Sequence, residues 1–276
     1  ENRGTEADAQ CMEPTISADG SLIAFSSNAS NLASGVDGTS TTNVFLRDMR
    51  SGAVTLISKN EMTGKGGGGS NPSISEDGSR IAFYNYAPLT KEDKNTLWDI
   101  YVWDGSSKLK RISKTTSGGD KDRGDESSSR VVAPSISGNG RYVAFATTAT
   151  NMVAGDGNGL QDVFVAEVDS GRVVWASSVD GNMAGDGDSP FGQGEKIAIS
   201  YDGNLVAFSS KAKNLGGNIV IKNLATNRIT PVSTDVTSTI GPPSMSRSGY
   251  YVIFGTNRQL DSRFSSSGTF VVYSER

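Results

Sequence analysis

Two loops of this sequence carry the same polar spacing: an aspartate, an asparagine two residues later, and a second aspartate four residues after that. The first loop contains Asp93, Asn95 and Asp99, and the second contains Asp156, Asn158 and Asp162. Carboxylate and amide oxygens are ligands that Ca²⁺ prefers, and alternate residues of a loop can point the same way. The spacing therefore predicts a candidate calcium site in each loop, and calcium is the only cofactor to which the sequence points.

The same residues have a second interpretation, in which they bind no metal. Asp99 and Asp162 stand at the start of an expected strand, where an aspartate accepts hydrogen bonds from the backbone of a turn. Neither loop has the length of an EF-hand or its terminal bidentate glutamate. Lys94 adds a repelling positive charge to the first loop. Both interpretations are open at the level of the sequence.

Three aromatic residues, Tyr84, Tyr86 and Trp98, lie around the first of these loops and outside the core pattern described below. Aromatic rings that gather on a surface form a stacking platform for a sugar or an anchor for a protein partner. Burial of the three rings under the long loop is the alternative. The sequence thus predicts a protein or glycan partner for this region.

Several kinds of catalysis are excluded by composition. The chain has no histidine and a single cysteine, Cys11. Ser-His-Asp and Cys-His chemistry, histidine-ligated metals and an intramolecular disulfide are therefore ruled out. A pair of carboxylates at a funnel, as in glycoside hydrolysis, needs no histidine. However, most acidic residues here recur at equivalent turn positions, as Asp19, Asp77 and Asp202 do, which indicates a structural role. We expect no enzymatic activity, and a glycan-cleaving enzyme is the less favoured alternative.

Composition also limits the partners. The net charge is −4 over 276 residues, and no stripe of lysine and arginine is present, which argues against nucleic acid. No apolar run is long enough to span a bilayer, so membrane insertion is not expected.

A sequence motif that occurs five times, called the repeated phrase below, predicts the strands between which all these residues lie. Residues 72–83 read Pro-Ser-Ile-Ser-Glu-Asp-Gly-Ser-Arg-Ile-Ala-Phe, and related phrases occupy residues 14–25, 134–145, 197–208 and 243–254. Asp-Gly and Asn-Gly are strong hairpin signals, and the flanking segments are rich in β-branched and aromatic residues. A third strand follows each phrase, as at residues 99–104, and a fourth strand ending in serine follows in the first four repeats. Four antiparallel strands per repeat predict an all-β fold of β-propeller blades.

The repeated phrase, followed by Asp99-Ile100-Tyr101-Val102, resembles the TolB-like repeat, which is also called the PD40 or WD40-like repeat. The resemblance covers essentially the whole chain and implies a single five-bladed β-propeller over residues 1–276. The expected blades are approximately residues 13–58, 71–113, 133–177, 196–233 and 242–276. Members of this family share a blade and not a chemistry; they include periplasmic scaffolds, peptidase-associated propellers and surface proteins.

The resemblance implies a bacterial binding or scaffold protein that is secreted, periplasmic or on the cell surface. A surface rich in Asn, Ser, Gly and Thr, and a first residue, Glu1, that is unusual for a translation start, point to export as well. The last blade lacks a recognisable fourth strand. It has three strands, or upstream residues complete it, or another chain does so. An open edge recruits strands, so self-assembly into a surface array or filament is the alternative function.

Overall fold

The computed structural model describes residues 6–36, 41–106, 108–122, 132–191, 196–233, 241–256 and 269–274. Their secondary structure is antiparallel β-sheet, with one 3₁₀ helix, η2 (Lys213–Leu215). The all-β prediction is confirmed. None of the helices in this part of the chain is long and apolar enough to cross a membrane.

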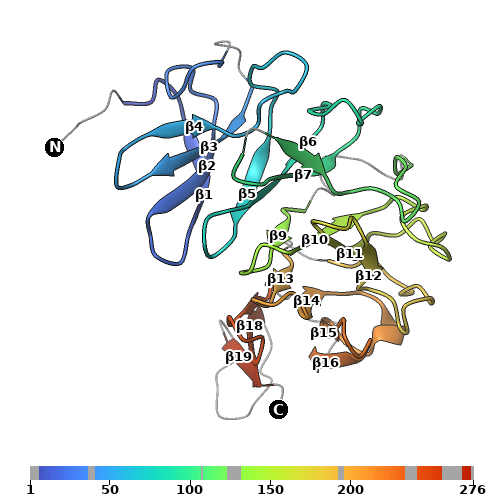
Figure 1. Ribbon diagram of the computed structural model, residues 1–276. Coiled ribbons are helices and arrows are strands. Elements are labelled where there is room, and N and C mark those ends of the chain that lie inside the picture. Colours follow the sequence, from blue (N-terminus) through green and yellow to red (C-terminus); the bar gives the residue numbers. More distant parts are fainter. Residues whose placement is uncertain are drawn as a thin grey trace. The chain divides into compact units, whose positions relative to one another are not determined.

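The chain forms two compact units, residues 1–113 and residues 114–276. The first unit holds two four-stranded sheets, in the strand orders β1-β2-β3-β4 and β5-β6-β7-β8 (Figure 1). The strands of the first sheet are β1 (Cys11–Ile16), β2 (Leu22–Ser27), β3 (Asn43–Asp48) and β4 (Val54–Leu56). Those of the second are β5 (Ser70–Ile74), β6 (Ile81–Asn85), β7 (Asp99–Trp103) and β8 (Leu109–Arg111).

The second unit holds two four-stranded sheets and one three-stranded sheet in its described residues. The third repeat consists of β9 (Ser135–Ile136), β10 (Tyr142–Thr147), β11 (Asp162–Glu167) and β12 (Val173–Trp175). The fourth consists of β13 (Ala198–Ile199), β14 (Leu205–Ser209), β15 (Ile219–Asn223) and β16 (Ile229–Ser233). The fifth consists of β17 (Ser244–Met245), β18 (Tyr251–Thr256) and β19 (Thr269–Ser274). Each predicted repeat therefore forms its own sheet, while closure into a single domain and ring stays a prediction.

The repeated phrase forms the first two strands of each sheet and a hairpin held by its own side chains. In the second repeat, Ser75 Oγ donates to Asp77 Oδ1 at 2.6 Å and the Ser79 N–H donates to the same oxygen at 3.0 Å. Gly78 takes a φ of +70° in the turn, a conformation that glycine adopts without strain. The equivalent residues Asp19, Asn139 and Asp202 accept the same bonds. These repeated acids therefore build turns, as predicted.

Backbone hydrogen bonds join neighbouring hairpins within each unit. In the first unit the Ala18 N–H donates to the Glu76 carbonyl at 2.8 Å. In the second, the Asn139 N–H donates to Tyr201 and the Tyr201 N–H donates to Arg247, both at 2.9 Å. The acceptors Glu76, Tyr201 and Arg247 hold the same place in their repeats, directly after the serine of the hairpin. Successive hairpins are therefore joined at the same acceptor position.

The sheets pack face to face through a small residue on one side and large residues on the other. In the first unit, Ala24 and Val44 share a core with Ile81 and Phe83 of the next sheet. In the second unit, the sheet of Ala144 packs on that of Phe208 in the same way. Alanine allows a close approach, and the large side chains fill the layer.

The fifth repeat departs from this rule. The other four repeats have a fully buried alanine at the equivalent position: Ala24, Ala82, Ala144 and Ala207. The fifth has Ile253, which is 42% exposed. The opposite face of the same strand is buried, since Val252 and Phe254 pack on the fourth sheet. On strand β18, the apolar side chains Tyr251 and Ile253 are therefore exposed within the second unit.

Candidate functional site

The second aspartate of each predicted metal loop takes part in a pair of hydrogen bonds to a serine hydroxyl, which we call the serine clamp. In the second repeat, Ser113 Oγ donates to Asp99 Oδ1 at 2.5 Å and accepts from the Ile100 N–H at 2.9 Å. The third repeat has the same bonds among Ser177, Asp162 and Val163, and the first has them among Ser58, Asn43 and Val44. The clamp ties the end of the fourth strand to the start of the third. Asp99 and Asp162 therefore have a structural role at the strand ends, through a serine hydroxyl and not through the backbone of a turn as the second interpretation expected.

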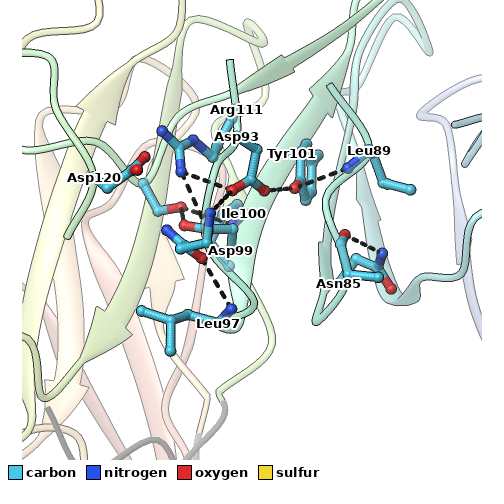
Figure 2. Close-up of polar contacts among 12 residues, drawn as sticks. Asn85, Leu89, Asp93, Leu97, Asp99, Ile100, Tyr101, Arg111 and Asp120 are labelled. Carbon is cyan, nitrogen blue, oxygen red and sulfur yellow. Dashed lines mark hydrogen bonds and ion pairs between the residues drawn. The ribbon is translucent and has the colours of Figure 1, made fainter. Parts of the chain in front are cut away.

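The first aspartate of the second repeat is held by a buried cation from the protein itself. Arg111 Nη1 lies 3.1 Å from Asp93 Oδ1 and 3.5 Å from Asp99 Oδ2, and all three side chains are buried. The hydroxyl of Tyr101 donates to Asp93 Oδ2 (Figure 2). A calcium ion bound by Asp93, Asn95 and Asp99 would have to displace this guanidinium. The observed geometry therefore argues against a calcium site in this loop, which stays a prediction.

In the third repeat, the residue equivalent to Arg111 is Trp175, and no described arginine pairs with the loop. Asn158 Nδ2 donates to Asp162 Oδ2 at 3.1 Å, which brings two of the three predicted residues together. Asp156 is only 6% exposed, and its Oδ2 atom has no hydrogen-bond partner among the described residues. Burial, reinforced by the charges of Asp162 and Asp122, raises the pKa of Asp156 to about 7. Burial also raises the pKa of Asp162, against the bond from Ser177.

The three predicted aromatic residues are in mutual contact. The ring centroids of Tyr84 and Trp98 lie 5.2 Å apart at an interplanar angle of 90°, and those of Tyr86 and Trp98 lie 5.4 Å apart at 60°. Tyr84 and Trp98 are half-buried, whereas Tyr86 is 45% exposed. We call these three residues the aromatic cluster. It is neither wholly buried under the loop nor wholly exposed.

A polar rim adjoins the aromatic cluster, and the sequence analysis missed it. Asn71 Nδ2 donates to the Tyr84 hydroxyl at 2.7 Å, and the Asn71 N–H donates to Glu13 Oε2 at 2.7 Å. Ser26 Oγ donates to the same carboxylate oxygen at 2.8 Å. Burial, with a smaller contribution from the Glu13 charge, raises the pKa of Tyr84. Exposed Glu13 thus connects the first sheet to the aromatic cluster of the second.

Two residues of the polar rim also have an unusual backbone conformation. Glu13 and Asn71 occupy equivalent positions before a proline, and both have positive φ, 54° and 53°. The register of each first strand shifts there, between Met12 and Thr15 in β1 and around Asn71 in β5. A glutamate in this conformation is strained, and such strain clusters at functional sites. In the sequence, the signal for this rim was the residue before the proline of the repeated phrase, Glu13 in the first repeat and Asn71 in the second.

Comparisons with known proteins show similarity in structure only. No known family profile matches the chain, and no curated protein matches it. A prolyl endopeptidase structure is 11% identical with a TM-score of 0.55, over 90% of this chain and 32% of that one. TolB from Acinetobacter baumannii is 20% identical with a TM-score of 0.48, over 96% of this chain and 52% of TolB. Nidogen, from a complex with laminin, is 8% identical with a TM-score of 0.46, over 90% of this chain and 72% of nidogen.

The similarity to the endopeptidase supports the architecture and does not identify a function. The endopeptidase match, with a TM-score above 0.5, indicates a shared fold at an identity too low to transfer any activity. This chain spans about half the length of TolB and about a third of the endopeptidase chain. Together with the repeated four-stranded sheets, the endopeptidase match supports a β-propeller class of fold.

Proposed function

We propose that this protein is a binding module without chemistry of its own, and that the aromatic cluster binds a glycan. The observation that carries the proposal is the contact of Tyr84, Tyr86 and Trp98 beside the polar groups of Asn71 and Glu13. Rigid strands supply the platform, because Tyr84 lies on β6 and Asn71 on β5. Loops displayed on a rigid scaffold are the usual location of binding residues.

The chemistry of the site suits a sugar ring. The apolar C–H face of a sugar stacks on tyrosine and tryptophan rings, whose faces carry partial negative charge. Its hydroxyl groups need donors and acceptors at the edge of the stack, which Asn71 and Glu13 provide. A protein partner normally covers about 800 Å² on each side, with an apolar centre. The aromatic cluster exposes one large ring, Tyr86, so a small polar ligand fits it better.

Five of the acids in the repeated positions have structural roles in this fold. Asp19, Asp77 and Asp202 hold hairpins, and Asp99 and Asp162 hold strand ends. Glu13 is the carboxyl group that the described residues place at the polar rim, and glycoside hydrolysis uses two carboxyl groups across one bond. Binding without turnover is therefore the function that the site supports better. We also propose export from the cell, on the resemblance of the repeats to TolB-like proteins.

A glycan array followed by calorimetry tests the proposal. We expect the wild-type protein to bind a subset of glycans, and Tyr86→Ala and Trp98→Ala each to weaken the affinity at least tenfold. Tyr250→Ala is the matched control, because Tyr250 is also exposed but lies in the second unit. Equal affinities of Tyr86→Ala and wild type for every bound glycan would contradict the proposal. Binding to a protein with the same dependence on Tyr86 would instead indicate a protein partner at the same site.

A second candidate function, assembly through the fifth repeat, rests on a separate observation. Ile253 and Tyr251 are exposed on a face that is covered in the other repeats. Light scattering over a wide concentration range should give about 28.9 kDa for a monomer and a rising mass for an assembly. Ile253→Ala restores the residue of the other four repeats and should abolish any growth in mass. A mass that stays at the monomer value at all concentrations would exclude this candidate.

A further inference from the structure

The second and third repeats contain the same polar loop in different surroundings. Asp93 and Asp156 hold the same place in the spacing. Strand pairing places Tyr101 opposite Arg111 in the second repeat and Phe164 opposite Trp175 in the third. The hydroxyl and the guanidinium that hold Asp93 are thus replaced by a phenyl ring and an indole.

Among the residues that the structure describes, the replacement leaves the buried carboxylates of the third repeat without a cationic partner. In the second repeat, two buried aspartates share one buried guanidinium. In the third repeat, neither Asp156 nor Asp162 forms an ion pair with any residue that the structure describes. The Trp175 indole N–H donates to Ser177 Oγ at 3.1 Å, which supplies a dipole and no charge. Buried carboxylates are normally paired or bound to a metal.

We propose that the loop of the third repeat binds Ca²⁺ through the carboxylates of Asp156 and Asp162. The ion takes the electrostatic role that Arg111 has in the second repeat. Asp156 Oδ2 is buried and accepts no hydrogen bond from the described residues, so it is available as a ligand. This site lies in the second unit, whereas the aromatic cluster lies in the first, and the proposal is independent of glycan binding.

The remaining ligands are neutral oxygens and water. No three acidic side chains of the described residues converge as a metal centre by themselves. Calcium accepts carbonyl and water oxygens in flexible geometry, whereas Mg²⁺ requires a near-ideal octahedron. Gly155 and Gly159 have positive φ, 88° and 65°, which turns the loop around Asp156. With two carboxylates we expect weak binding, with a dissociation constant of about 10⁻⁴–10⁻³ M.

Melting in calcium and in chelator is the first test. In about 10 mM CaCl₂ we expect the melting temperature of the wild type to rise by about 5 °C relative to EDTA. Asp156→Asn should abolish the rise, and it should fold because it removes a buried charge. Phe164→Tyr, which imitates Tyr101, should reduce the rise by giving Asp156 a hydrogen-bond donor. MgCl₂ at the same concentration should have less effect than CaCl₂.

Terbium luminescence is the second test and requires no change in stability. Tb³⁺ replaces Ca²⁺ on oxygen ligands, and the Trp175 indole next to the Asp162 clamp should sensitise its emission. We expect CaCl₂ to quench this emission competitively and Asp156→Asn to lower it at least tenfold. Asp93→Asn is the matched control: it should destabilise the fold and leave the emission unchanged. The proposal is overturned if the wild type shows no calcium-dependent melting and no sensitised emission, or if Asp156→Asn retains both. Protonation of Asp156 would then be the way in which its charge is relieved.

Discussion

The buried guanidinium of Arg111 should be essential to the second repeat. Arg111→Met keeps a chain similar to the aliphatic part of arginine and removes the charged guanidinium. The variant leaves the carboxylates of Asp93 and Asp99 buried without the cation that lies 3.1 Å and 3.5 Å from them. At an effective dielectric constant of about 20, each of these contacts contributes about 5 kcal/mol of attraction.

The loss of stability is smaller than the sum of these attractions, because a buried aspartate can take up a proton. Protonating an aspartate with a reference pKa of about 3.9 costs about 4 kcal/mol at pH 7 and about 1.5 kcal/mol at pH 5. We therefore expect Arg111→Met to lower the free energy of unfolding by about 4 kcal/mol at pH 7, within the range for breaking one side of a buried ion pair. The deficit should shrink to about 2 kcal/mol at pH 5, since protonation is then cheaper.

Urea denaturation at pH 5, 6 and 7, followed by tryptophan fluorescence, measures this deficit through the shift of the transition midpoint. Asp93→Asn combined with Arg111→Met should recover part of the loss, because one buried charge is then removed together with its partner. A deficit below about 1 kcal/mol at pH 7, or one that is the same at pH 5, would show that Arg111 does not neutralise these carboxylates.

The other predictions concern packing, the serine clamp and a buried lysine. Ile81→Ala should cost about 2–5 kcal/mol, because Ile81 fills the layer between two sheets; a near-neutral result in urea denaturation would contradict the packing. Ser58→Ala should cost about 1–3 kcal/mol by leaving the buried Val44 N–H without its acceptor, whereas an unchanged midpoint would exclude the clamp. Burial lowers the pKa of Lys222 to about 8, while the unfolded lysine keeps a pKa near 10.5. The unfolded state therefore binds more protons between these pH values, and the stability of the wild type should rise with pH across this window. Lys222→Met should be more stable than wild type at pH 7 and lose this advantage by pH 10; a constant difference in melting temperature would refute the assignment.

The architecture could be predicted from the sequence because its signals are local. A hairpin such as that of Asp77 and Gly78 is specified by adjacent residues, and the alternation of Ile81, Ala82 and Phe83 assigns the two faces of the next strand. The same sequence signals recur in every repeat, so an ambiguous signal in one repeat can be interpreted by comparison with the others. The division into two compact units was not predicted, since no local composition marks residue 113.

The sites were only partly predictable because they depend on residues far apart in the sequence. The spacing of Asp93 and Asp99 is identical to that of Asp156 and Asp162, yet only the first pair has a cationic partner among the described residues, Arg111. The deciding residue lies on the fourth strand, outside the motif. The contact of Trp98 with Tyr84 and Tyr86 could be predicted because all three flank one loop. The contact of Glu13 with this region could not be predicted, because Glu13 belongs to the preceding repeat and accepts a hydrogen bond from Asn71 of the next one.

Glycan binding by the aromatic cluster is the central claim, and the indole region of a ¹H–¹⁵N NMR spectrum tests it most directly. The chain has three tryptophans, so Trp103 and Trp175 serve as internal references for Trp98. On addition of a glycan selected on the array, we predict that the Trp98 signal shifts in a saturable manner while the other two stay in place. A glycan that binds by calorimetry and leaves the Trp98 signal unmoved would contradict the account.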